Sequence, residues 1–272
     1  MLDSGVAFVP TSRIPVKSIA LPVEHGSWGF LFEPLLAGLL IAPTIGGAFL
    51  SIFMIGAFLS RQPLKFVVGD YLQKKRLPRT AVAFRWTLYF ASIATTGLIA
   101  SIFTASPHSF VPLVIASPIV IYLILQDASR KSRETLVELL AASVLAASIA
   151  SLSLAAAHAY AFAAAMWLIM LARLIPSVLY VKNRLRLEKK KEYSVALPVG
   201  AHIAAAGALL ALYALGFGSA LTILVALFLL VRSITGLSSK RRKLTAKQLG
   251  VREVVYGCVY ALSVVAGYYA GF

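Results

Sequence analysis

Long apolar runs divide this chain into segments suited to crossing a membrane. As helices, runs of about 17 to 25 residues match the hydrocarbon layer of a bilayer. They predict helices at 26–44, 46–60, 80–105, 110–126, 135–155, 158–181, 196–214, 217–236 and 253–271. The second is short, and Leu64, Phe66 and Val67 could extend it past Arg61. Hydrophobic residues make up 60% of the sequence and its mean hydropathy is +0.85, which leaves no soluble domain beside the helices. We expect an all-α, polytopic membrane bundle of about nine transmembrane helices, with one domain at 24–272.

Lysine and arginine occupy alternate connections of this predicted bundle. The connections at 61–79, 127–134, 182–193 and 238–252 are charged, whereas those between them contain no lysine or arginine. Cytoplasmic loops collect such residues. We therefore expect an integral protein of a prokaryotic-type cytoplasmic membrane, with the charged connections and the N-terminal tail, 1–23, in the cytoplasm and Phe272 outside. The tail has no long apolar core and does not resemble a cleaved signal peptide.

The formal net charge of +16 is spread over several connections that flank apolar segments. In such places positive charge orients a protein in the membrane and attracts anionic headgroups, so the expected partners are membrane lipids and not nucleic acid. The single cysteine, Cys258, lies inside the last apolar run. It excludes an internal disulfide and leaves no cysteine-based metal motif.

Polar residues at the start of the first helix are candidates for chemistry. At helical spacing, His25, Gly29 and Glu33 share one face, and small residues normally mark close packing between membrane helices. This face should therefore point into the bundle, where Glu33 would serve as an acid or base with His25 as its partner. The alternative is a neutral, hydrogen-bonded Glu33 and an interfacial His25.

Two charged clusters follow the second and fourth helices. Arg61 and Lys65 lie one helical turn apart, followed by Asp70, a spacing suited to holding an anion or a carboxylate from another loop. Snorkelling cations at the membrane surface are the alternative. After the fourth helix, Asp127 begins a run in which Arg130 and Glu134 are spaced to pair.

Glu138 lies four residues into the fifth apolar run and needs a cation from another helix. Arg85, Arg173 and Arg232 all enter apolar sequence from the same side of the predicted membrane, so we expect one of them to pair with Glu138. Arg173 is the deepest, and Ser177, Tyr180 and Arg184 continue its helix face. Such a long polar stripe should not face lipid.

The last helix repeats the pattern of a carboxylate among glycines. Thr245 and Gln248 form a predicted capping box, which starts a helix whose free N–H groups favour an anion. Gly250, Glu253 and Gly257 then lie on one face. We expect this face and that of the first helix to share a pocket, although a capped helix with a paired Glu253 explains the same residues.

Several phrases of the sequence resemble the recurring blocks of YwiC-like integral membrane proteins, a family without a settled function. They are Val23-Glu24-His25-Gly26-Ser27-Trp28-Gly29-Phe30, Arg61-Gln62-Pro63-Leu64-Lys65, the run 127–134, Arg173 to Tyr180 with Arg184 and Arg186, and Ala246 to Gly250 with Glu253. A more distant likeness, of topology alone, is to the UbiA superfamily of intramembrane prenyltransferases. That superfamily has nine helices and places its working loops after helices two, four, six and eight.

The likeness to the UbiA superfamily implies magnesium and a prenyl diphosphate, which its members hold with two aspartate-rich motifs. Here the first of these loops contains only Asp70, and the loop after the sixth helix has no aspartate. Because magnesium prefers several carboxylate, water and phosphate oxygens, its binding is doubtful and we assign no metal ligand and no cofactor.

Three functions remain open from the sequence. The first is a lipid-handling transferase, or a protein that binds an isoprenoid or lipid phosphate; the others are a small-anion carrier and a scaffold of a membrane complex. The catalytic candidates are Glu33, Glu138 and His25. The residues expected to bind an anionic headgroup are Arg61, Lys65, Asp70, Asp127, Arg130, Arg133, Arg173, Arg184, Lys247 and Glu253.

Overall fold

A computed structural model describes residues 16–22, 25–75, 77–129, 131 and 133–271, and the side chains of residues 25–27 lie outside this description. The described residues form helices and no strand, which confirms the all-α prediction. The helices are α1 (Val16–Ala20), α2 (His25–Ile41), α3 (Ile45–Leu72), α4 (Pro78–Thr104), η1 (Pro107–Phe110), α5 (Val111–Ala128), α6 (Thr135–Ala155), α7 (Tyr160–Glu188), α8 (Ala196–Ala214), α9 (Ala220–Gly236) and α10 (Ala246–Tyr269).

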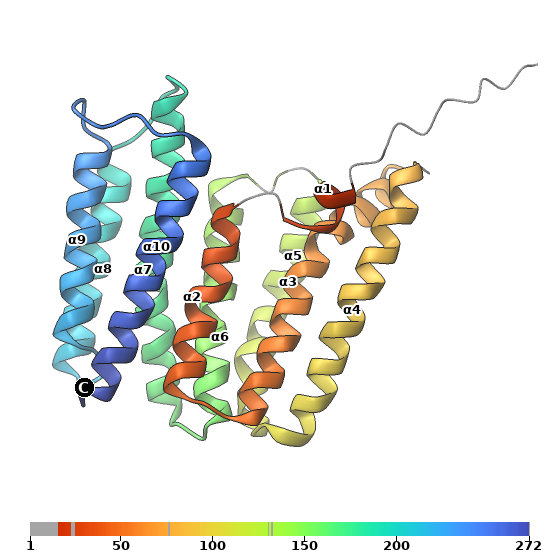
Figure 1. The fold of residues 1–272 in the computed structure, drawn as a ribbon, viewed down its shortest axis with the longest axis horizontal. Coiled ribbons are helices and arrows are strands. Elements are labelled where there is room, and N and C mark those ends of the chain that lie inside the picture. Colours follow the sequence, from red (N-terminus) through yellow and green to blue (C-terminus); the bar gives the residue numbers. More distant parts are fainter. Residues whose placement is uncertain (1–15, 23–24, 76, 130, 132, 272) are drawn as a thin grey trace, which may run out of the picture.

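Seven helical segments of the described chain are long and apolar enough to cross a membrane, so the protein is an integral membrane protein. They are α3, α4, η1 with α5, α6, α7, α8 and α10. The apolar helices α2 and α9 have 17 residues each, about 26 Å at the rise of an α-helix, slightly less than a hydrocarbon layer of about 30 Å. Both lie in the same bundle (Figure 1). Nine membrane crossings remain a prediction.

Several helices extend beyond the apolar runs that predicted them. The second predicted helix continues past Arg61 to Leu72, as α3, and includes Pro63. The helix α7 continues to Glu188, and α10 begins at Ala246, at the predicted capping box and seven residues before its apolar run. Lysine, arginine and leucine are good helix formers, so a helix continues where the bilayer-compatible composition ends. Hydropathy therefore marks where the apolar composition ends, and not where the helix itself ends.

The helices run side by side with alternating direction, and the connections after α3, α5, α7 and α9 lie at one end (Figure 1). The C-terminus lies at the other end. The predicted N-terminal tail falls mostly outside the described residues, but α1 packs against α3 and α4. The Gln62 side chain donates a hydrogen bond to the Ser18 carbonyl oxygen at 2.9 Å.

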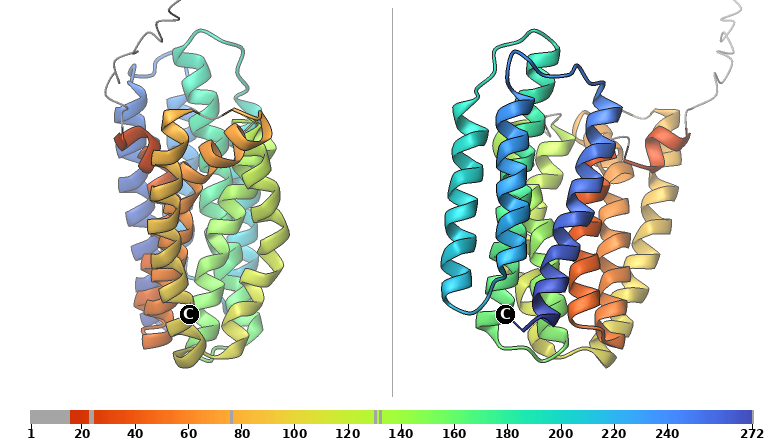
Figure 2. Two further views of the ribbon diagram at one scale, coloured as in Figure 1. Left: turned by 90° about the vertical axis from the view of Figure 1, so that its right-hand side faces the viewer. Right: turned by 60° about the vertical axis from the view of Figure 1, so that its left-hand side comes forward.

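The centre of the bundle is formed by α7. Its side chains Met166, Ile169, Met170 and Leu174 are almost fully buried and belong to one apolar cluster with residues of α2, α6, α8, α9 and α10. The helix α10 packs against α2, α9 and α7, as the views in Figure 2 show. Polar side chains on the inner faces of α2, α7, α9 and α10 are thereby brought together.

Candidate functional site

Four charged side chains from four helices meet inside the bundle: Glu33 of α2, Arg173 of α7, Arg232 of α9 and Glu253 of α10. Their exposed fractions are 4%, 1%, 9% and 3%. We call these four residues the interior charge network. It contains two positive and two negative charges, as burial requires, because an unpaired charge in a membrane is very unfavourable.

Arg173 joins the two carboxylates. Its Nε atom lies 3.4 Å from Oε2 of Glu33, and its Nη1 atom lies 3.6 Å from Oε2 of Glu253. Nη2 donates a hydrogen bond to the main-chain oxygen of Glu253 at 3.0 Å, and Nη1 donates to Ser177. The predicted polar face of this helix is therefore buried, and Arg173 links α2 to α10.

Arg232 completes the network by pairing with Glu253. Its guanidinium carbon lies 3.9 Å from the ring centroid of Tyr180 and 5.3 Å from that of Tyr256. Such cation–π contacts stabilise a desolvated guanidinium. The Tyr180 ring fits against Gly236, where a Cβ atom would collide with the phenol.

Glycines make the room that Glu33 occupies. A Cβ atom added at Gly257 would collide with the Glu33 carboxyl group, and one at Gly29 would lie 3.2 Å from its Oε1 atom. The glycine faces of α2 and α10 thus let a carboxylate fit between two closely packed helices. This confirms that the Glu33 face points inward and that it meets the Glu253 helix.

Hydrogen bonding inside the network is incomplete. Among the described residues, Oε2 of Glu33, Nε of Arg173, Oε2 of Glu253, and Nε and Nη2 of Arg232 have no hydrogen-bond partner. The pairs at 3.4 and 3.6 Å are longer than ordinary N–H···O bonds. Buried polar atoms are normally satisfied, so such a group of exceptions is typical of a site that binds a ligand or water.

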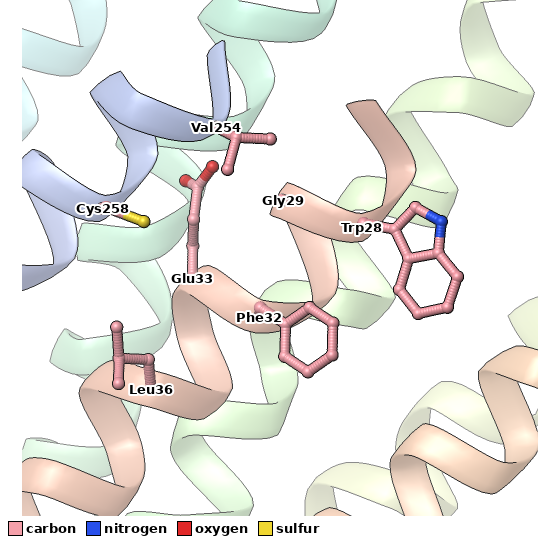
Figure 3. Close-up of a pocket in the computed structure, with 7 residues that line it drawn as sticks. All are labelled: Trp28, Gly29, Phe32, Glu33, Leu36, Val254 and Cys258. Atoms are coloured by element: carbon pink, nitrogen blue, oxygen red, sulfur yellow. The ribbon is translucent and has the colours of Figure 1, made fainter. Parts of the chain in front are cut away.

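A small cleft of about 80 Å³ leads to Glu33 between α2 and α10 (Figure 3). Glu33 is the only charged residue in the part of its lining that the structure describes, and the Glu33 carboxyl group points toward α10. The lining residues are Trp28, Gly29, Phe32, Glu33, Leu36, Val254 and Cys258. The cleft is smaller than the roughly 300 to 1,000 Å³ of pockets that enclose a small molecule, so it can cover only part of a large ligand.

The charged residues predicted at the membrane surface make separate contacts. Arg61 binds Asp127 through two contacts, Nε to Oδ2 at 2.5 Å and Nη2 to Oδ1 at 2.9 Å. This confirms the expectation that Arg61 is placed to hold a carboxylate from another loop. The buried Asp70 instead binds Arg79 at 2.7 Å. Lys65 lies over the Phe66 ring at 5.3 Å.

The prediction named the wrong cations for Glu138. Its carboxylate pairs with Lys182 at 2.8 Å, whereas Arg173 and Arg232 bind other carboxylates and Arg85 is exposed. Lys182 also donates to the main-chain oxygen of Arg133 at 2.7 Å. Lys182 was assigned to a connection because it follows an apolar run, but it belongs to α7 and faces the start of α6.

Arg184 and Lys247, two further predicted site residues that the structure describes, do not line the cleft. Arg184 is buried near the end of the bundle at which the connections after α3, α5, α7 and α9 lie, which we call the charged end. It binds Glu188 at 2.7 Å and the carbonyl oxygen of Arg242 at 2.5 Å. Lys247 is exposed on α10. Arg130 and the side chain of His25 lie outside the described residues.

Sequence reasoning missed two features of the site region. Cys258, which was not among the predicted site residues, lines the cleft and is exposed. His202 of α8 is buried; its Nδ1 lies 2.7 Å from the Pro198 carbonyl oxygen, while Nε2 has no hydrogen bond within the described chain. The signal for His202 was a titratable residue within an apolar run.

A separate groove of about 280 Å³ lies at the charged end, between α6, α7 and the start of α8. Lys182, Asn183 and Arg186 line it, together with Glu192. The Asn183 side chain accepts a hydrogen bond from the Ser194 main-chain N–H at 2.8 Å, which fixes the groove's wall. Within the described residues, no group of three histidine, cysteine, aspartate or glutamate side chains is arranged to hold a metal ion.

Comparison with known proteins identifies one family. The sequence profile of the YwiC-like protein family matches residues 21–155. Searches of the curated proteins and of the solved structures gave no match, so the likeness to the UbiA superfamily remains a prediction. The matched segment contains α2 to α6, and with them Glu33 and the Arg61–Asp127 pair. Residues 21–155 thus match the YwiC-like family, and the apolar helices make the chain an integral membrane protein.

Proposed function

We propose that this protein binds a lipid that enters from the bilayer, with part of the chain in the cleft between α2 and α10 and the head at Glu33. One observation carries the proposal: an apolar cleft between α2 and α10 leads to a buried carboxylate whose Oε2 atom has no hydrogen-bond partner among the described residues. Ionisable groups within membrane segments are rare and usually functional.

The lining of the cleft suits an apolar chain. Trp28 and Phe32 stack with ring centroids 5.9 Å apart and form one wall, and Leu36 continues this wall along α2. A volume of about 80 Å³ holds only a short part of such a chain. The remainder of the ligand would stay among the bilayer lipids, which agrees with a ligand that is itself a membrane component.

Glu33 and Arg173 would act together on the head of the ligand. Arg173 holds the carboxylate from behind, at 3.4 Å, and Glu33 faces the cleft. In a lipid transferase, this carboxylate would be the acid or base, and Arg173 would fix its position. Binding is the step tested first, because any such chemistry depends on it.

Cys258 provides a direct readout, since it is the only cysteine in the sequence and lines the cleft. The purified protein is reconstituted in nanodiscs of defined lipid and treated with N-ethylmaleimide, and the labelled fraction is followed by intact-protein mass spectrometry. Lipids that copurify with the protein are identified in parallel. We expect an enriched lipid that, when added back, slows the labelling of Cys258.

Two leucines of α2 give a matched pair of variants. Leu36→Trp fills the cleft, whereas Leu40→Trp changes a similarly exposed leucine that does not line it. Leu36→Trp should weaken lipid binding at least about tenfold, equivalent to about 1.4 kcal/mol, and Leu40→Trp should not. If no lipid is enriched and none protects Cys258, the lipid proposal is rejected.

A small-anion carrier is the second candidate, favoured by the interior charge network. Four buried charges with several unsatisfied atoms are a feature of ion pathways as well as of binding sites. A carrier would exchange anions across proteoliposomes, and Arg173→Gln would abolish the exchange. Exchange without lipid binding would favour this candidate over the first.

A further inference from the structure

We infer that the lipid head recognised at Glu33 is an uncharged hydrogen-bond donor, the hydroxyl group of a long-chain alcohol, and not a phosphate. This inference rests on the proposed lipid-binding function and specifies its ligand. It departs from the expectation, drawn from the many cations in the sequence, that the site binds an anionic head.

The charge balance of the site is the first argument. The interior charge network has two guanidinium groups and two carboxylates, so its formal charge is zero before any ligand binds. An uncharged head preserves this balance. A phosphate would add negative charge to a desolvated region in which every arginine of the network already has a carboxylate partner.

The position of the charges is the second argument. Among the described residues, Glu33 is the only charged one that lines the cleft, and Arg173 lies behind it. A phosphate that enters from the bilayer would therefore meet a carboxylate before it met an arginine. Like charges repel strongly where water is excluded, so the cleft selects against an anion.

The unsatisfied oxygen is the third argument. Oε2 of Glu33 is buried, and its contact with Nε of Arg173 at 3.4 Å is longer than an ordinary hydrogen bond. Among the described residues it accepts no hydrogen bond. Ionised carboxylates only accept hydrogen bonds, and a hydroxyl group has one hydrogen to donate. A hydrogen bond between the hydroxyl group and this carboxylate would be charge-assisted, and it would supply the hydrogen bond that the buried acceptor lacks beside its ion pair with Arg173.

The other cations do not offer the phosphate an alternative place in this cleft. Arg61 binds Asp127, and Arg184 binds Glu188, in both cases away from the cleft lining. Arg232 contacts two tyrosine rings and Glu253 and is not among the residues that line the cleft. A lipid phosphate would instead find exposed cations such as Arg186 at the charged end, outside the cleft.

The test compares heads on one isoprenoid tail. Geranylgeraniol, its acetate ester and its monophosphate are each titrated against the protein in nanodiscs, and protection of Cys258 from N-ethylmaleimide is measured. The ester is uncharged but has no hydrogen-bond donor, so it separates the effect of charge from the effect of hydrogen-bond donation. Geranylgeraniol should protect at a concentration at least about tenfold lower than either of the others.

Glu33→Gln tests the role of the charge with little change of shape. Its amide oxygen still accepts a hydrogen bond, but the network gains a net positive charge. Binding of the alcohol should therefore persist. The ratio of the protective concentration of the monophosphate to that of the alcohol should fall at least about tenfold. Circular dichroism and the unfolding temperature establish that the variant is folded, and Glu33→Asp, which retains the charge, should retain the preference.

The outcomes separate this inference from the proposed function. Equal or stronger protection by the monophosphate or the ester would overturn the inference and leave the lipid cleft in place. An unchanged preference in a folded Glu33→Gln variant would also overturn it, because the carboxylate charge would then not select the head. If none of the three compounds protects Cys258 and no lipid copurifies, the proposed function itself fails.

Discussion

Glu253 is the residue on which the interior charge network depends most, because its carboxylate pairs with both Arg173 and Arg232. In Glu253→Gln both arginines would remain buried with too little negative charge. Breaking a buried ion pair typically costs about 3 to 5 kcal/mol. We expect a loss of this size in chemical unfolding in detergent. Glu192→Gln, which changes an exposed glutamate, should be nearly neutral, and similar losses in the two variants would contradict a stabilising role for the network.

Gly257 should tolerate no side chain, because a Cβ atom there would collide with the Glu33 carboxyl group. Overpacking of this kind typically costs about 1 to 3 kcal/mol, which we expect for Gly257→Ala in thermal unfolding. The control, Gly207→Ala, has no atom within 4 Å of the new Cβ and should be neutral or slightly stabilising. Adding Glu33→Ala should recover part of the loss, and an additive double variant would argue against the contact.

The sequence predicted the charged residues of the site better than their partners. Glu33, Arg173 and Glu253 stand out because ionisable groups are costly in apolar runs. Their pairing depends on which helices are neighbours, and no local pattern contains that information. Glu138 illustrates the limit: three deep arginines were the expected partners, but Lys182, at the end of the adjacent α7, is closer in space.

At the scale of the helices, α3 and α4 approach each other closely because glycines remove the intervening side chains. A Cβ atom at Gly56 would lie 2.6 Å from the main-chain nitrogen of Ala94, and one at Gly97 would lie 2.6 Å from that of Phe53. Because backbone atoms cannot move aside, Gly56→Ala and Gly97→Ala should each destabilise the bundle by about 1 to 3 kcal/mol. The measurement is unfolding in detergent, with Gly200→Ala of α8, which meets no atom within 4 Å, as the control.

The helices themselves were largely predictable, since apolar runs gave the middle of every long helix. Their ends were not, because a helix that leaves the bilayer keeps its hydrogen bonds while its composition changes. The end of α3 shows this: twelve residues, 61–72, were assigned to a charged connection but continue the helix to Leu72. In contrast, the start of α10 carries its own local signal, and the predicted capping box between Thr245 and Gln248 is present.

At the scale of the whole molecule, the family match and the site divide the chain differently. The YwiC-like profile ends at residue 155, the last residue of α6, whereas three of the four network residues lie in α7, α9 and α10. Glu33 is the network residue within the matched segment. The ion pair between Glu33 and Arg173 therefore joins the family segment to the helices that follow it.

The orientation of the bundle gives the last prediction. The connections after α3, α5, α7 and α9 lie at one end, and the chain finishes at the other (Figure 1). Since lysine and arginine resist translocation, the charged end should face the cytoplasm. Reporter fusions at Lys75, Lys131, Lys190 and Arg241 should report a cytoplasmic location, and one after Phe272 should report the outside.

A fusion at Gly216, between α8 and α9 and at the same end of the bundle as the C-terminus, is the matched control and should also report the outside. A cytoplasmic signal from both Gly216 and Phe272 would mean an inverted bundle. The same signal from Phe272 alone would mean that α10 does not complete a crossing. Either result would also change the depth in the membrane at which a lipid meets Glu33, because the cleft is formed by α2 and α10.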